Sequence, residues 1–447
     1  MKINKKVLVI TTLLAIGIGA GIVGTQAQAP VTIDYWLWDT NQFPAYQKCA
    51  VNFEKTNPGF KVKVQQKGWD DYWTGINTGF VAGTAPDIFT NHLAKYPEYA
   101  LNKQIVDVAP WIKEDKVPTD IYQGELIKLW GRDGKQYGLP KDWDTVAIVY
   151  NKAMLKDAGI SEASLNNLKW NPRDGGTFQK IVAQLTIDAN GNRGDSKNFD
   201  KTKIKQYGFV SLPGNSAGGA YGQTEWSHFA VSNGFKFTDG PWAKKYNYDD
   251  PKLAESLQWQ ADLSLVKGFA PLYKDTKANN GNAVFQAGKA ALIFDGSWTV
   301  SGYRANSKFD IGFAQLPIGP VGRRTMFNGL ADSIWVGSKH QKEAWQWMKY
   351  MASPACQNTV GDFGVVFPAI PSAIKKAVAA FKKKGVDISA YTKEALAKDS
   401  TFLFPITDNA GEIGDIMTKV LDRIFLGDAK AADVLKEAND KVNALFK

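Results

Sequence analysis

The strongest constraint on the fold is an alternation of strand and helix patterns near the start of the chain. Strand patterns occupy residues 31–38, 60–64 and 85–89, and helical spacing occupies residues 44–55 and 70–82. Each helical pattern stops at a turn signal, Asn57-Pro58-Gly59 for the first and Gly83 for the second. A β-α-β-α-β order predicts a parallel sheet covered by helices, with a ligand crevice at the carboxyl ends of its strands. Those ends lie at residues 36–39 and 88–92.

The rest of the chain also contains both strand and helix patterns. Further strand patterns occupy residues 145–150, 204–211, 290–294 and 309–316, and helical patterns occupy residues 284–289, 344–352 and 429–446. A length of 447 residues is typical of two or three domains. We find no internal repeat and no long low-complexity linker. We therefore expect an α/β protein whose domains are joined by several crossings of the chain.

The first thirty residues have the order of a secretory signal. A basic start is followed by an uncharged apolar stretch at residues 7–24 and by small residues at 25–29. We predict a signal peptide over residues 1–29, cleaved after Ala27 or Ala29, and a periplasmic protein. The apolar stretch approaches the length of a membrane span, so retention as an anchor is the alternative. No Cys follows it, which excludes a lipoprotein anchor. Its G-x-G-x-x-G sequence at residues 19–24 lies inside the predicted signal and not in a βαβ unit, so no nucleotide site is predicted.

The net charge of +10 falls to +7 when the three lysines of residues 1–6 are removed. The densest basic run, residues 382–384, lies beside Gly385, where a helix would end and where lysines favour the helix dipole. We therefore predict no nucleic-acid partner.

Cofactor and metal chemistry has little support in the composition. Two Cys and three His are too few for a Cys-rich zinc site or a His-built cluster, so we predict no cofactor and no metal. Residues 188–192 begin like a calcium loop, but Arg193 and Phe199 replace the Gly and Glu of an EF-hand. A looser calcium site is left open there. Cys49 and Cys356 could pair in an oxidising compartment, but their distance cannot be judged from sequence.

Ten short motifs, taken in order, resemble those of the extracellular sugar-binding proteins of ABC importers, the maltose-binding-protein-like members of solute-binding protein family 1. Each motif is weak alone, but together they cover nearly the whole chain after residue 30. They are NPGFKV at 57–62, WDDYW at 69–73, GTAPDIF at 83–89, GKQYGLP at 134–140, YNK at 150–152, FQAGKAA at 285–291, DGSW at 295–298, NGL at 328–330, EAW at 343–345 and VFPA at 366–369.

The resemblance implies a two-lobed periplasmic binding protein fold (type II-like) with the ligand in a cleft between α/β lobes. Three hinge crossings are expected near Asp144, Gly312 and Gly364. Lobe one is then residues 30–144 plus 313–364, and lobe two is residues 145–312 plus 365–447. The implied function is binding of a sugar or oligosaccharide by a monomer and its delivery to an ABC permease in the inner membrane, with no enzymatic activity.

A sugar site needs flat aromatic rings for C–H faces and planar polar groups for hydroxyls. Trp298 matches the sugar-stacking Trp of the family. The crevice argument adds polar side chains after the first and third strands and at the first hinge. For Trp298 and Trp226 the alternative is packing in the core, and for Trp69 it is a hydrophobic staple at the start of its helix. The full set of candidate ligand-binding residues is Trp38, Asp39, Asn41, Gln42, Trp69, Asp87, Asn91, His92, Trp143, Asp144, Trp226, Asp295, Trp298, Asn328 and Glu412.

Two rival functions are weighed against this prediction. A secreted glycosidase needs two carboxyl groups on opposite sides of one bond, and adjacent acidic pairs such as Asp70-Asp71 and Asp249-Asp250 cannot provide them. The same fold could bind a non-sugar solute such as a glycerol phosphodiester or a polyamine. Phosphate recognition favours arginine clamps, and the candidate residues include no arginine.

Overall fold

The computed structural model describes residues 29–210, 219–276 and 281–447. Residues 1–28 of the predicted signal peptide lie outside these ranges. Within the described ranges, no helix has both the length and the apolar character needed to cross a membrane.

The first half of the molecule is built on a seven-stranded sheet with the order β13-β6-β12-β3-β1-β2, in which β14 also pairs with β12. Strand β1 pairs in parallel with β2 and β3, as the sequence predicts, whereas β12 runs antiparallel to β3 and β6. The bounds are β1 Val31–Leu37, β2 Phe60–Gln66, β3 Ile88–Asn91, β6 Leu139–Asp144, β12 Thr325–Ile334, β13 Phe367–Pro368 and β14 Thr401–Leu403.

Helices cover both faces of this sheet. Tyr35 of β1 points toward α1 and α12, and Trp36 points toward α2, because neighbouring strand residues face opposite ways. The helices are α1 Phe43–Thr56, α2 Trp69–Ala82, α3 Tyr96–Leu101, α4 Ala109–Glu114, α12 Gln341–Met351, α13 Pro354–Phe363 and α14 Pro371–Lys383, with the 3₁₀ helix η1 Leu126–Trp130 and the hairpin of β4 Gly131–Arg132 and β5 Lys135–Gln136.

A disulfide between Cys49 and Cys356 joins α1 to α13 beneath the first sheet. The two Cα atoms are 5.3 Å apart, which is an ordinary separation for a disulfide. The pairing that the sequence left open is therefore present.

The second half is built on a five-stranded sheet with the order β11-β7-β10-β9-β8. Its strands are β7 Val146–Asn151, β8 Ile187–Asp188, β9 Ile204–Val210, β10 Ala290–Gly296 and β11 Ile311–Ala314. Around it lie α5 Lys152–Asp157, α6 Gly176–Leu185, α7 Ser227–Ser232, α8 Pro251–Leu265, α9 Tyr273–Thr276, α10 Gly281–Gln286, α11 Val300–Asn306, α15 Ser389–Leu396, α16 Ala410–Leu426 and α17 Ala431–Ala444, with the 3₁₀ helices η2 Glu162–Asn167, η3 Gly219–Tyr221 and η4 Ser297–Thr299.

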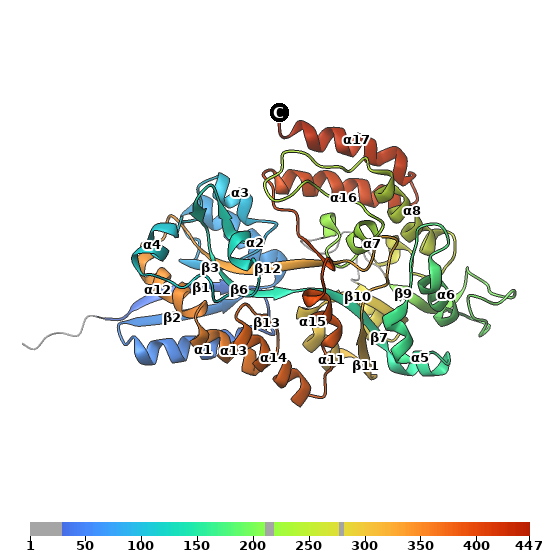
Figure 1. Ribbon diagram of the computed structural model, residues 1–447, viewed down its shortest axis with the longest axis horizontal. Helices are drawn as coiled ribbons and strands as arrows, with labels where there is room; N and C mark the ends of the chain where they lie inside the picture. Colours follow the sequence, from blue (N-terminus) through green and yellow to red (C-terminus); the bar gives the residue numbers. More distant parts are fainter. Residues whose placement is uncertain (1–28, 211–218, 277–280) are drawn as a thin grey trace, which may run out of the picture.

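The chain passes between the two sheets at the ends of β6 and β12. Strand β6 ends at Asp144 and β7 begins at Val146 in the other sheet, so a single residue separates them. The chain returns between β11 and β12. Figure 1 shows the two halves side by side, with β6 and β12 running from one toward the other. Beyond the crossing predicted near Gly364, β13 still pairs with β6 and α14 still packs on α13, so the chain stays in the first half past that point.

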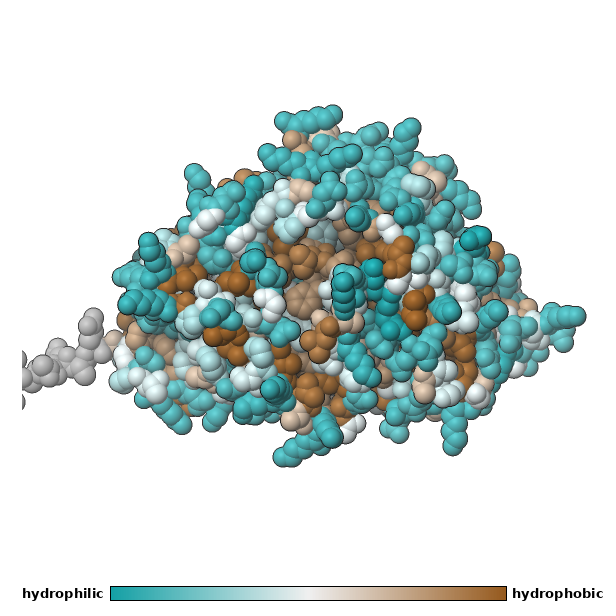
Figure 2. Space-filling view, in the orientation of Figure 1, coloured by the Kyte–Doolittle hydropathy of each residue, from teal (hydrophilic) through white to brown (hydrophobic). Residues whose placement is uncertain are grey.

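The outer surface is mainly hydrophilic on the face shown in Figure 2. Hydrophobic residues lie at the bottom of a hollow near the middle of this face, where the two halves meet. The region between the halves is therefore the place to look for a ligand site.

Candidate functional site

Four polar side chains from separate segments meet where β6 and β12 pair. Asn328 lies opposite Asp144 in the register of the two strands. The Asn328 Nδ2 atom is 3.0 Å from His92 Nε2 and 3.4 Å from Asp144 Oδ2. Gln223 Nε2 lies 3.5 Å from Asp144 Oδ1. The structure thus brings together three predicted residues, and it adds Gln223, which the sequence analysis did not single out.

Burial controls the protonation of this cluster. It raises the pKa of Asp144 well above its usual range, and the nearby Asp142 carboxyl raises it further, while the Asn328 and Gln223 amides oppose this. Burial lowers the pKa of His92 to about 3, so its ring is neutral. The backbone N–H of Ala94 donates to His92 Nδ1 at 3.0 Å. Asn328 Oδ1 has no hydrogen-bond partner within the described part of the chain.

A row of aromatic rings runs through the same cluster from the first half to the second. Trp38 packs edge-on against Trp69 with ring centroids 5.1 Å apart, and Trp69 packs against His92 at 6.1 Å. The His92 ring then contacts Phe404, the residue after β14, at 5.3 Å. Phe404 contacts Tyr221 of η3 at 5.1 Å. The first three pairs of this row pack edge to face, and the Phe404–Tyr221 pair is tilted at 58°.

Trp298 stands apart from this row and is half-buried in η4. It belongs to none of the three clusters of buried apolar residues in the described chain. Its ring lies over Gly296, where an added Cβ would come within 1.9 Å of a ring atom. The neighbouring Ser297 donates its backbone N–H to the Thr145 carbonyl at 3.0 Å, which places this turn beside the end of β6. Trp298 is therefore a partly exposed ring in a turn bonded to the residue that follows Asp144.

Asp295 supports the Trp298 turn. It accepts hydrogen bonds from the Tyr303 hydroxyl at 2.6 Å, the Asn282 amide at 3.0 Å and the Gly296 backbone N–H at 2.7 Å. Burial raises its pKa to about 6, against the opposing effect of these donors. Because its oxygens are engaged by neighbouring groups, Asp295 holds the turn in place.

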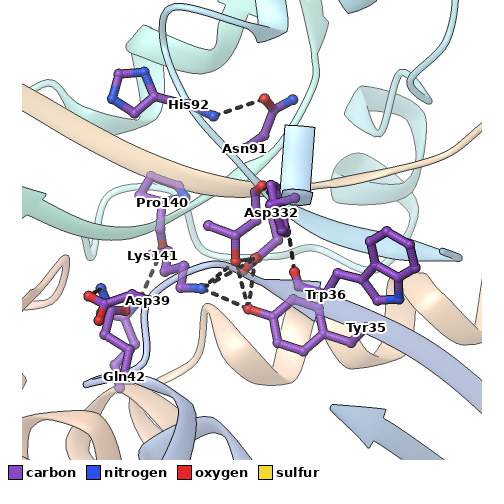
Figure 3. A network of polar contacts seen from close by, with 12 residues as sticks. Tyr35, Trp36, Asp39, Gln42, Asn91, His92, Pro140, Lys141 and Asp332 are labelled. Atoms are coloured by element: carbon purple, nitrogen blue, oxygen red, sulfur yellow. Dashed lines mark hydrogen bonds and ion pairs between the residues drawn. The ribbon is translucent and has the colours of Figure 1, made fainter. Parts of the chain in front are cut away.

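A second polar group lies on the other side of the first sheet and is shown in Figure 3. The Lys141 Nζ atom donates to the Tyr35 hydroxyl and the Thr90 hydroxyl, both at 2.7 Å, and lies 3.5 Å from Asp332 Oδ1. A bulge in β6 makes room for this lysine, because Leu330 and Ala331 of β12 pair with Asp142 and Pro140 and leave Lys141 as the extra residue.

Asp39 and Gln42 lie beside Lys141 (Figure 3). Gln42 Nε2 donates to Asp39 Oδ2 at 2.9 Å, and the backbone N–H of Asn41 donates to Asp39 Oδ1 at 2.7 Å. Asp142, their neighbour on β6, is buried with neither carboxylate oxygen hydrogen-bonded within the described residues. The sequence analysis missed Asp142. The signal was available, since three charged residues in a six-residue strand that is buried throughout need a reason to be buried.

Several predicted site residues have structural partners instead. Asp87 lies before β3, at the end opposite His92, and accepts hydrogen bonds from the Asp34 backbone at 2.8 Å and the Ser338 hydroxyl at 2.6 Å. Asn91 is fully buried and bonds to Ser333 in the neighbouring strand. The structure therefore does not bring Asp87 into the site, and Asn91 fixes the end of β3.

Two predicted tryptophans are packed in the interior. Trp143 is stacked between Phe327 and Phe367, with centroids 5.7 and 4.6 Å away. Trp226 is fully buried, and its indole N–H donates to the Gly219 carbonyl at 3.2 Å. Glu412 is exposed in the first turn of α16 and has no contact with the polar cluster among the described interactions.

Metal ligation finds no support in the described residues, where no group of three or more His, Cys, Asp or Glu side chains could hold an ion. The sequence leaves a calcium site open at residues 188–192, and the Asp188 carboxylate of this loop bonds to the loop's own backbone. Asp188 accepts backbone N–H groups from Asn190, Asn192 and Asp200 at 2.8 Å each, and these hydrogen bonds close the loop.

The chain is similar to known proteins over most of its length. The sequence model of bacterial extracellular solute-binding proteins matches residues 48–387. The maltodextrin-binding protein of Bacillus subtilis is 24% identical over 412 residues, covering 89% of this chain and 86% of the relative. A putative binding protein of Brucella abortus is 24% identical over 414 residues, covering 90% of each. Among solved structures, an ABC substrate-binding protein from Listeria monocytogenes in complex with cycloalternan aligns with a TM-score of 0.78 at 20% identity, over 93% of this chain and 99% of that one.

Proposed function

Because the chain belongs to the bacterial extracellular solute-binding proteins, we propose that it binds a sugar or oligosaccharide between its two halves and delivers it to an ABC importer. The observation that carries the proposal is the position of Trp298. A partly exposed ring lies in a turn that bonds to Thr145, the residue after Asp144 of the buried polar cluster, and sugars need both kinds of surface.

In this proposal the Trp298 ring packs against a sugar C–H face. Asp144 and Asn328 take hydroxyl groups, since the Asn328 oxygen has no partner within the described protein and the two bonds to Asp144 are long. Buried polar groups of this kind reject ligands that cannot satisfy them, which gives the site its selectivity.

Closure of the site follows from the crossings of the chain. The predicted lobes are residues 30–144 plus 313–364 and residues 145–312 plus 365–447. In this proposal the boundary at residue 364 moves beyond α14, and the two lobes turn about the ends of β6 and β12. Ligand contacts from both lobes stabilise the closed arrangement and shift the population toward it. The protein acts in this proposal as a periplasmic monomer, exported by its signal peptide, without a cofactor and without catalysis.

The proposal is tested by thermal shift of the secreted protein against mono-, di- and oligosaccharides, with glycerol phosphodiesters and polyamines in parallel. A ligand at 100 times its Kd adds about 2.7 kcal/mol to the folded state, which raises Tm measurably. We expect one sugar series to shift Tm, and Trp298→Ala to abolish that shift. Trp111→Ala, which removes a ring from the remote helix α4, is the matched control and should retain it. A shift by phosphodiesters or polyamines alone would move the ligand to the non-sugar class.

A further inference from the structure

We infer that Arg132, Trp242 and Asp408 form a clasp between the two halves of the molecule, which keeps the proposed site closed and so retains a bound sugar. The inference rests on the proposed function and adds positioning residues to it. None of the three belongs to the candidate ligand-binding residues, so the clasp acts through the closure of the site.

The clasp is held by an ion pair and a ring contact. Arg132 of β4, in the first half, donates from both Nη atoms to the two Asp408 carboxylate oxygens, at 2.5 and 2.9 Å. Its guanidinium carbon lies 4.3 Å from the Trp242 ring centroid. The Arg132 and Asp408 side chains are only 24% and 21% exposed. A two-point pair shielded in this way is stronger than an exposed pair, and a cation over a tryptophan ring adds to it.

Each side of the clasp is anchored in its own half. In the first half, the Tyr96 hydroxyl donates to the Leu129 carbonyl at 2.6 Å, and the Tyr96 ring packs edge-on against Trp242 at 5.7 Å. In the second half, the Trp242 backbone N–H donates to the Ile406 carbonyl at 2.6 Å, two residues before Asp408. Trp242 and Asp408 are therefore tied to one another and contact the first half as a unit.

The backbone of Trp242 is strained. Its φ is 62°, in the left-handed region that a bulky side chain rarely adopts. Strain of this kind persists only where neighbouring groups hold it, and it is concentrated in segments with a functional role. The neighbouring groups here are Ile406, which accepts the backbone N–H, and Gly131 of the first half, which accepts the indole N–H at 3.2 Å. Separation of the halves removes the second contact and lets the strained segment relax.

The clasp lies on the same seam between the halves as the proposed site. At the site, the His92 ring contacts Phe404 at 5.3 Å. Four residues further along these two segments are Tyr96, which packs on the clasp, and Asp408, which belongs to it. Figure 1 shows the helices that follow, α3 and α16, on one side of β6 and β12. A rotation about the ends of β6 and β12 that separates His92 from Phe404 therefore also pulls the clasp apart.

The clasp controls how long a sugar is retained. It consists of groups of the protein alone, so it favours the joined halves whether or not a sugar is bound. A bound sugar leaves after the halves separate, and loss of the clasp makes separation more frequent. A coupling of ordinary size changes such an equilibrium about fivefold or more. Because the clasp does not hold the sugar itself, every sugar that binds should be affected by the same factor.

The first experiment measures the separation of the halves without any sugar. Both native cysteines are in the disulfide, so spin labels attach only to the introduced pair Val81→Cys on α2 and Val266→Cys after α8, at positions 91% and 50% exposed. Double electron–electron resonance should give longer and more widely spread label distances in Arg132→Gln, and separately in Trp242→Ala, than in the labelled parent.

The matched control is Arg193→Gln. Arg193 lies 2.9 Å from Asp157, and both residues belong to the second half. This change removes an arginine–aspartate pair and leaves the clasp intact, so the label distances should equal those of the parent. Asp408→Asn, which keeps the shape of the side chain, is a second way to break the ion pair of the clasp. Melting curves of all variants report on folding.

The second experiment measures release of the sugar that the thermal shift identifies. Stopped-flow dissociation should be faster than in the parent by about fivefold or more in Arg132→Gln and in Asp408→Asn. The ratio of Kd values between two sugars should stay the same. A purely structural role of the pair would lower Tm and leave both the label distances and the dissociation rate unchanged.

The outcomes separate the inference from the function on which it rests. Label distances equal to those of the parent in both Arg132→Gln and Trp242→Ala overturn the clasp, and this result needs no sugar. Longer distances with an unchanged dissociation rate overturn its role in retaining the ligand. Failure of every sugar to bind overturns the proposed function, and the label distances still decide whether the clasp joins the halves.

Discussion

Asp142 and Asp144 face different surroundings although they are two residues apart on one strand. Asp144 has two amide donors within 3.5 Å, and Asp142 has no hydrogen-bond donor of ordinary geometry in the described chain. Burial is the largest cause of the raised pKa of both groups. Asp142, with a pKa raised to about 7, is therefore poised to change its charge near neutral pH.

The raised pKa of Asp142 predicts that Asp142→Asn stabilises the folded protein more at high pH than at low pH. The folded-state pKa of Asp142 is above its ordinary value of 3.8, so the folded protein holds the proton more tightly, and the stability this gives is lost as pH rises toward 7. Asn does not titrate. The free energy of unfolding of Asp142→Asn relative to the parent should therefore be greater at pH 8 than at pH 5, by on the order of 2 kcal/mol.

Urea unfolding of both proteins at the two pH values measures this difference. Asp70→Asn, at an exposed position, is the control for the loss of one negative charge. An equal effect of Asp142→Asn at pH 5 and pH 8 would show that Asp142 is ionised throughout this range.

At the scale of elements, the bulge in β6 and the disulfide beneath the sheet hold the first half together. The bulge admits Lys141 into the interior, where it pairs with Asp332 of β12 and lies 3.9 Å from the Tyr46 ring centroid of α1. The disulfide fixes α1 to α13, whose residues are 307 positions apart in sequence. Both features connect early and late parts of the chain.

Removing the lysine should be severely destabilising. Lys141→Met leaves Asp332 as a buried charge without its cation, which typically costs about 3–5 kcal/mol. Chemical unfolding of Lys141→Met and of the double variant Lys141→Met/Asp332→Asn measures this. The double variant should recover part of the loss, and a further loss would mean that the pair is held mainly by its hydroxyl partners.

The disulfide should add to the free energy of unfolding independently of the Lys141–Asp332 pair. Replacing both Cys49 and Cys356 by Ser should lower the free energy of unfolding by about 2–4 kcal/mol, because the unfolded chain gains freedom. Thermal melts with and without reductant test this: reductant should lower the Tm of the parent and leave that of the double variant unchanged. Equal melting of the parent in both conditions would contradict the prediction.

Elements were easier to predict from sequence than the site was. The helices predicted at residues 44–55 and 70–82 occupy Phe43–Thr56 and Trp69–Ala82, because apolar spacing and turn residues are local signals. The strand predicted at residues 85–89 is instead Ile88–Asn91, since its limits depend on pairing with β1 and β12. In the same way, residue type does not separate a ring that packs on Phe367, as Trp143 does, from one left partly exposed, as Trp298 is.

At the scale of the whole molecule, contacts outside the proposed site also join the two halves. Arg132, in the first half, forms a two-point ion pair with Asp408, which precedes α16, with N–O distances of 2.5 and 2.9 Å. The same guanidinium lies 4.3 Å from the ring centroid of Trp242. The Trp242 indole N–H donates to the Gly131 carbonyl at 3.2 Å, so the loop before α8 is tied to the β4–β5 hairpin.

We expect these groups to be energetically coupled. In a double-mutant cycle, Arg132→Gln and Asp408→Asn should show an interaction energy of about 1–2 kcal/mol, which is more than an exposed pair gives, since both side chains are about four-fifths buried and the pair is bidentate. Urea unfolding of the parent, the two single variants and the double variant provides the four values. Additive effects would mean that the two halves are held together by other contacts.

The strand order of the first sheet has a consequence for the time at which the protein can fold. Strand β12 lies between β3 and β6, so residues 31–91 keep an unpaired strand edge until residues 325–334 have been synthesised. Contacts between such distant parts of a chain form slowly, and an incomplete sheet has little stability of its own. A ribosome must therefore make about three quarters of the polypeptide before its first sheet can close.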